Sequence, residues 1–403
     1  MTSPRLREQP RQPHNSQWYH ETQRSVRGDL PLEPQAALIR DRFLLGLGEF
    51  TDPALNQALI ARAPVFAASL ACCHVLFPEQ VALSRHVTLS PYDRLCTALT
   101  VAQVTGVQSL CSHYAARLAP LDSPDASRES NIRLAQITQY ARQLATQPTL
   151  ICRKALQQLS DVGLSVADIV SFVQIIGFVS YQARVVAGIA ALAGRPAAVA
   201  PGFTTQQDAE PLRLDQRPPI WQARLAPLQP AEAAAEQLDV LDQSHPDART
   251  QDYYLLLAHD AAALRERNGV FNGIHGGNND EENGRLMALA ALCASRINGS
   301  RYCAAGVAAD LHHPPLVHSL CGSIDAGYQR ATPRQRAVIQ VSSALTRSPE
   351  KFTPHSVQPL FQQDVTQAQA LDLILTSALY AWENRLRYSL GDTLAAGAQQ
   401  EDA

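Results

Sequence analysis

The sequence is poor in charge and has no paired cysteine motif. Only 18% of its 403 residues are Asp, Glu, Lys or Arg, the net charge is −3, and the basic residues are almost all scattered arginines. Nucleic-acid binding needs basic residues gathered on one face, so this composition argues against a nucleic-acid partner. The eight cysteines form no CxxC pair, and no His or Cys spacing suggests zinc. We therefore expect no metal, no other cofactor, and mostly reduced, packed thiols.

Strand signals and a signal sequence are also lacking. Without runs of alternating β-branched residues or a βαβ rhythm, the fold class should be all-α. Residues 1–30 are rich in Pro, Gln and Arg and have no apolar core, which predicts a flexible N-terminal arm in a cytoplasmic protein. The most apolar segment, 169–183, is uncharged over fifteen residues but contains Gln174. Since a bilayer span takes about 20 apolar residues, we expect a buried core helix there and no membrane association.

What the sequence does have is a weak internal repeat. With an offset of 193 residues, 98–118 aligns with 291–311, and the two segments share a central glycine, Gly106 in one and Gly299 in the other. Further on, an offset of 201 residues relates four pairs of features: Arg133 and Arg334, Leu144 and Leu345, Pro148 and Pro349, and the aromatic-x-x-Arg of Tyr181 to Arg184 and of Trp382 to Arg385.

Each half of this repeat predicts one helical unit. The unit has a helix broken at a glycine, a middle helix ending before a proline, and a long apolar last helix that starts after a cap, Ser165 or Thr366. Between the halves, the proline-rich segment 196–230 predicts a linker or a wrapping strap. We expect helical domains over 31–195 and 231–403.

Four segments together resemble one known family. They are "SRINGSRYC" at 295–303, "ALTRSP" at 344–349, "LYAWENRLRYSLGD" at 379–392 and "IIGFVSYQARVVAGIAALAG" at 175–194. On these segments the chain resembles the carboxymuconolactone decarboxylase and AhpD-like alkylhydroperoxidase superfamily, over most of 40–194 and 230–392. The resemblance implies two tandem helical units that form a pseudo-dimer, a peroxidase or antioxidant activity, and assembly into a homo-oligomer.

The catalytic motif of that family is mostly absent. Active members have a glutamate on the preceding helix and then Gly-Cys-x-x-Cys-x-x-x-His. Carried over to this sequence, the glutamate falls on Ala288, the first cysteine on Ser300, the second on Cys303 and the histidine on Val307. The same positions in the first half are Leu95, Val107, Leu110 and Tyr114. Only Cys303 keeps the type of residue that the motif requires.

Cys303 and Ser300 are the candidate catalytic residues. Asn298-Gly299 favours a positive φ that breaks the helix, which makes Ser300 an N-cap and places Cys303 near N3, where the helix dipole lowers a thiol pKa. A peroxidatic cycle also needs a proton donor and a resolving thiol. Other nearby residues could assist: Arg296 and Arg301 by charge, His312, His313 and His318 as bases, and Cys293 or Cys321 as the second thiol.

Two hypotheses stay open. In the first, Cys303 acts as a monothiol peroxidase on a small-molecule substrate, and an external thiol reductant closes the cycle. In the second, the chain is a non-redox homologue, either a binding or assembly protein or a decarboxylase-like acid–base enzyme. There Ser300 is only a cap and Cys303 a packed thiol.

Further pocket candidates are Tyr302, Trp382, Arg385 and His312. Trp382 with Arg385 could form the wall of a substrate pocket with an arginine for an anion, or a packed aromatic beside an interhelical or intersubunit ion pair. The Gly- and Asn-rich segment 268–284 predicts a loop leading into the next helix, or a lid.

Overall fold

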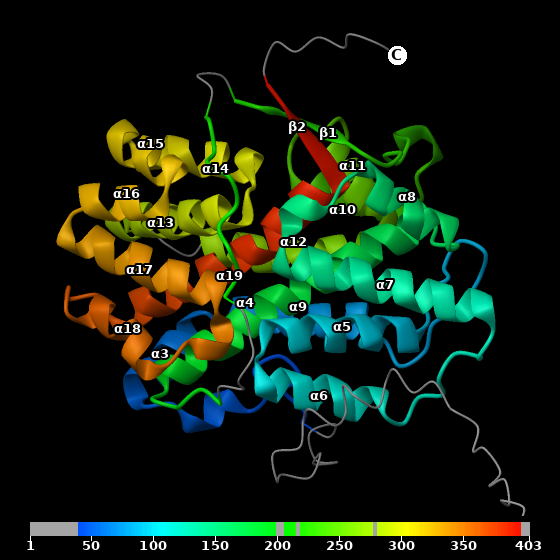
Figure 1. Ribbon diagram of the computed structural model, residues 1–403, viewed down its shortest axis with the longest axis horizontal. Coiled ribbons are helices and arrows are strands. Elements are labelled where there is room, and N and C mark those ends of the chain that lie inside the picture. Colours follow the sequence, from blue (N-terminus) through cyan, green and yellow to red (C-terminus); the bar gives the residue numbers. More distant parts are fainter. Residues whose placement is uncertain (1–38, 199–204, 215–217, 277–279, 396–403) are drawn as a thin grey trace, which may run out of the picture.

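The computed structural model describes residues 39–198, 205–214, 218–276 and 280–395, and their regular secondary structure is helical apart from one two-stranded ladder (Figure 1). The predicted all-α class is confirmed. The predicted arm at 1–30 lies outside the described residues.

The helices of the first half are α3 (Pro53–Ala61), α4 (Ala63–Leu76), α5 (Pro91–Thr105), α6 (Gln108–Leu118), α7 (Arg128–Thr146), α8 (Arg153–Asp161) and α9 (Val166–Leu192). Those of the second half are α10 (Ala235–Ser244), α11 (Asp252–Leu257), α12 (Ala261–Gly276), α13 (Glu281–Asn298), α14 (Arg301–Ala308), α15 (Pro314–Gly322), α16 (Ile324–Arg330), α17 (Pro333–Arg347), α18 (Pro354–Phe361) and α19 (Gln367–Leu390).

Helices α9 and α19 pack against each other at the centre, with α5–α8 on one side and α13–α18 on the other (Figure 1). Both start at the predicted caps, because Ser165 and Thr366 each form a reciprocal capping box with the residue three positions later. Among the described residues, α9 is the one unbent helix long and apolar enough to cross a bilayer, and 94% of its most apolar window is buried inside the protein. It is the core helix that the sequence predicts. The bent pair α3 and α4 meets the same criterion only if counted as one span.

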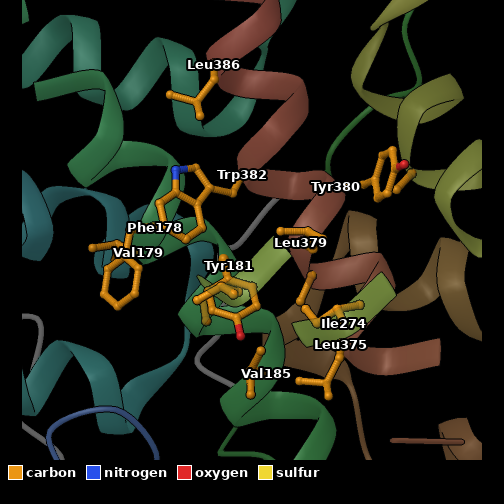
Figure 2. Close-up of a cluster of buried hydrophobic side chains, with 14 of the residues drawn as sticks. Phe178, Val179, Tyr181, Val185, Ile274, Leu375, Leu379, Tyr380, Trp382 and Leu386 are labelled. Carbon is orange, nitrogen blue, oxygen red and sulfur yellow. The ribbon is translucent and has the colours of Figure 1, made fainter. Parts of the chain in front are cut away.

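Two glycines let α9 and α19 approach closely. A Cβ on Gly177 would lie 2.1 Å from Cδ1 of Trp382, and one on Gly188 would lie 2.4 Å from Cγ2 of Ile374. Figure 2 shows Trp382 packed above Phe178, with Tyr181 beside them. Tight packing of this kind needs the absence of a side chain on one helix.

The two halves repeat the same order of elements. α5 and α13 each end at a glycine of positive φ, 72° at Gly106 and 79° at Gly299, and each is followed by a second helix. α7 and α17 each end just before a 3₁₀ turn at a proline, followed by a short helix and then by α9 or α19. The second half has α15 and α16 between α14 and α17, where the first half has a loop.

The segment between the halves is a strap rather than a free linker. In its described part, the two carboxylate oxygens of Asp208 accept hydrogen bonds from Nε and Nη2 of Arg347 at 2.7 and 2.6 Å. The amide of Ala209 donates to the carbonyl of Ile297 at 3.0 Å. Further on, β1 (Ile220–Ala223) pairs antiparallel with β2 (Gly391–Leu394). The sequence missed this ladder, because four-residue strands with few β-branched residues carry no strand pattern.

Candidate functional site

A cavity of about 350 Å³ lies in the second half, between α12, α13, α14 and α19. α19 contributes Thr376, Tyr380, Glu383 and Arg387, whose spacing of four, three and four residues puts them on one helix face. The other helices contribute Phe271 and His275 from α12, Met287, Ala288 and Ala291 from α13, and Tyr302, Cys303 and Val307 from α14.

The predicted backbone geometry around Cys303 is confirmed. Gly299 ends α13 with a φ of 79°, Ser300 is the extended N-cap residue, and Cys303 is the third residue of α14. The side chain of Ser300, however, makes no capping hydrogen bond. Cys303 lines the cavity, but the residue is only 6% exposed.

The predicted lowering of the Cys303 pKa is wrong. Burial, reinforced by the negative charge of Glu383, raises the pKa of Cys303 to about 12. Arg387, Ser300 and Arg267 act in the opposite direction, but burial outweighs them. Cys303 is therefore a neutral thiol at physiological pH.

A buried charge cluster lies beside Cys303. Glu383 accepts hydrogen bonds from the Tyr253 hydroxyl at 2.8 Å, from Arg387 Nε at 2.9 Å and from Arg267 Nη2. Burial alone would raise the pKa of Glu383, but the two guanidinium groups outweigh it and lower that pKa to about 2. Burial alone would lower the pKa of Arg267 and of Arg387. Both pKa values are nevertheless raised, in part by the Glu383 carboxylate. The carboxylate is therefore ionised.

This cluster has no recognisable pattern in the sequence. Glu383 and Arg387 stand four residues apart on α19, which is an ordinary surface pattern, and Arg267 is 116 residues from Glu383. Of the two arginines suggested by the sequence, Arg296 donates to the backbone carbonyls of Ala209 and Gly322 instead, and Arg301 is not among the residues that line the cavity.

Three of the four positions matched to the family motif meet in this cavity: Ala288, Cys303 and Val307 line it, whereas Ser300 is buried outside it. In the first half the matching side chains are larger and buried. There Tyr114, at the position of Val307, donates to Gln182 Oε1 at 2.6 Å and packs on Phe77 with ring centroids 5.3 Å apart. Gln182 stands 201 residues before Glu383, so an amide replaces the carboxylate.

Of the pocket candidates, Tyr302 lines the cavity, but Trp382 and Arg385 do not. Trp382 points to the opposite side of α19 from Tyr380 (Figure 2) and donates to Gln174 Oε1 at 2.9 Å. Arg385 is fully buried and donates to the backbone carbonyls of Ala381 and Ala145. The pocket-wall interpretation of this pair is wrong. The packed-aromatic alternative fits, with carbonyls in place of the expected carboxylate.

His312 lies at a different cavity, of about 640 Å³, which also involves His313, His318, Cys321 and the described part of the strap. His313 Nδ1 accepts from the amide of Leu316 at 3.1 Å and so caps α15. None of the three histidines lines the cavity of Cys303, so the structure does not bring the proposed bases to the thiol.

No second thiol lines the Cys303 cavity, and all eight cysteines are free. Burial raises the pKa of Cys293 to about 12 and that of Cys321 to about 11.

The predicted loop at 268–284 is helical up to Gly276, as part of α12, and it brings Phe271 and His275 to the cavity. His275 stacks on Phe271 with ring centroids 4.3 Å apart, and burial lowers its pKa, so the imidazole is neutral.

In the described part of the chain, no three His, Cys, Asp or Glu side chains are grouped so that they could hold a metal ion. No protein-family model matches the sequence, and no curated protein matches it.

Proposed function

We propose that the chain is a non-redox homologue of the AhpD-like superfamily, built as two tandem units that form an internal pseudo-dimer. In this proposal the second unit binds a small organic ligand in the Cys303 cavity, and the first unit is structural. The observation that carries it is the state of Cys303, whose pKa of about 12 keeps the thiol protonated beside the charged Glu383.

Two further observations support the family assignment within this proposal. The element order repeats between the halves, and the motif positions Ala288, Cys303 and Val307 line one cavity. The resemblance also implies a homo-oligomer, which stays a prediction.

The residues around the cavity favour binding over proton transfer. Glu383, with a pKa of about 2, holds no proton to donate at neutral pH and is a weak base. The guanidinium of Arg387 lies 3.3 Å from the centroid of the Tyr253 ring and 4.5 Å from that of Tyr302. The cluster is therefore a rigid, charged wall, and such walls orient a ligand.

A second candidate is the monothiol peroxidase, which one observation favours: the Cys303 side chain lines the cavity, and Arg387 acts to lower its pKa. The thiolate would attack one oxygen of a hydroperoxide, giving a sulfenic acid and an alcohol once the leaving oxygen takes a proton. Two equivalents of external thiol would then return Cys303 to the thiol and yield water and a disulfide.

Peroxide turnover and ligand binding separate the candidates. We expect the protein and Cys303→Ala to consume peroxide equally slowly in the presence of dithiothreitol, with no sulfenic acid trapped at Cys303 by dimedone. Small aromatic probes such as benzamide and benzoate should bind, as detected by ligand-observed NMR. Ala288→Leu, which copies Leu95 of the first half, should abolish that binding. Turnover that depends on Cys303 would instead establish the peroxidase.

A further inference from the structure

We infer that the ligand of the Cys303 cavity is a small organic carboxylate whose two oxygens bind Nη1 and Nη2 of Arg387. This inference rests on the proposed binding function of the cavity. It adds the chemical class of the ligand and the group that anchors it.

Arg387 is held so that only one edge of its guanidinium is open. Its Nε donates to Glu383 Oε1 at 2.9 Å, and its Cζ lies 3.3 Å from the centroid of the Tyr253 ring and 4.5 Å from that of the Tyr302 ring. Among the described residues, no acceptor bonds Nη1 or Nη2, and neither nitrogen is sealed away from open space. Because Arg387 lines the cavity, this edge is available to a ligand there. Paired donors of this geometry match a carboxylate.

The charges at this end of the cavity do not balance. Arg267 and Arg387 are positive, and Glu383 is the one carboxylate that bonds them in the described part of the chain. His275 adds no charge, because burial lowers its pKa. Asp310 also lines the cavity but is exposed to solvent. A buried positive charge without a full partner is costly, so a ligand carrying one negative charge would be favoured.

The rest of the cavity sets the size and polarity of the ligand body. Phe271, Met287, Ala291 and Val307 are apolar, and the volume of about 350 Å³ is at the small end for ligand pockets. A compact aromatic or branched aliphatic body fits these walls. A single guanidinium edge and one unbalanced charge favour a monoanionic carboxylate over a doubly charged phosphate.

The test compares benzoate with benzamide, which have nearly the same shape and differ in charge. We expect isothermal titration at pH 7 to show benzoate binding about tenfold more tightly, the range of one charge-assisted hydrogen-bond pair. Arg387→Gln should remove this preference, and Arg387→Lys, which keeps the charge but loses the planar edge, should reduce it. If Arg387→Gln does not fold, Arg387→Lys alone tests the inference.

Arg336→Gln is the matched control. Arg336 lies 5.7 Å from the Tyr328 ring and donates to two backbone carbonyls, but it is outside the cavity, so the preference should be unchanged. Equal affinities for both probes, or a benzoate preference that persists in both Arg387 variants, would overturn the carboxylate inference and leave the binding function intact. If neither probe binds the unmodified protein, the proposed function itself fails.

Discussion

Arg385 of α19 donates a hydrogen bond to the backbone carbonyl of Ala145 in the last turn of α7. The converse contact joins Arg184 of α9 to the carbonyl of Thr346 in the last turn of α17, 201 residues after Ala145. Carbonyls in a last helical turn have no donor within their own helix. Each buried arginine therefore joins the central helix of one half to the middle helix of the other.

This reciprocity predicts matched effects on stability. Arg385→Ala and Arg184→Ala should each lower the free energy of unfolding by about 3 kcal/mol or more, because each leaves a void and an unpaired buried carbonyl. Urea unfolding measures both, with the exposed Arg330→Ala as the control that should change little. A cost at one position and none at the other would contradict the proposed pseudo-dimer.

Gly177→Ala should also destabilise the protein. The new Cβ would lie 2.1 Å from the Trp382 indole, and overpacking of this kind costs about 1–3 kcal/mol. Gly322→Ala is the control, since a Cβ there meets nothing within 4 Å. If the clash is the cause, the double variant Gly177→Ala, Trp382→Leu should lose less stability in thermal unfolding than the sum of the losses of the two single variants. Strictly additive losses would rule the clash out.

Much of the fold could be predicted because its signals are local. The capping boxes at Ser165 and Thr366 and the helix break at Gly299 each depend on residues within a few positions of one another. The same break places Cys303 third in α14 and beside Tyr302. Local rules therefore led to Tyr302 and Cys303, which both line the cavity.

The chemistry at that wall could not be predicted, because it depends on contacts between distant segments. The pKa of Cys303 is set by burial and by Glu383, eighty residues later in the chain. Helix periodicity says that Trp382 and Glu383 face different directions, but not which direction is the cavity. Trp382 was the predicted pocket residue, but its large ring is buried in the core instead.

The low pKa of Glu383 predicts that the protein loses stability at acid pH. Its folded-state pKa of about 2 lies below its ordinary value of 4.5, so its stabilising effect is complete above pH 4.5 and disappears as the pH falls toward 2. This difference corresponds to about 3 kcal/mol. Urea unfolding between pH 3 and pH 6 should show a shallower pH dependence for Glu383→Gln than for the unmodified protein. Identical slopes would show that the carboxylate is not held in its charged form.

The strap should loosen when Asp208 is changed. Asp208→Asn removes the charge that binds Arg347 at two points, so the amides of Gln206, Ala209 and Leu212 should exchange with solvent faster. Hydrogen exchange with mass spectrometry measures this. Asp242→Asn breaks a similar two-point pair with Arg249 on the exposed surface and should leave the strap unchanged. Unaltered exchange in Asp208→Asn would mean that other contacts hold the strap.

The most direct test of the account is the reactivity of each thiol in the folded protein. Iodoacetamide and hydrogen peroxide are applied from pH 6 to pH 9, and modification is mapped by mass spectrometry. Cys152 should react first, because it is exposed and the backbone amides of Ala155 and Lys154 lower its pKa. Cys303, with a pKa of about 12, should stay unmodified until the protein is unfolded. Sulfenic acid at Cys303 near pH 7, with peroxide consumption that is lost in Cys303→Ala, would contradict the non-redox account.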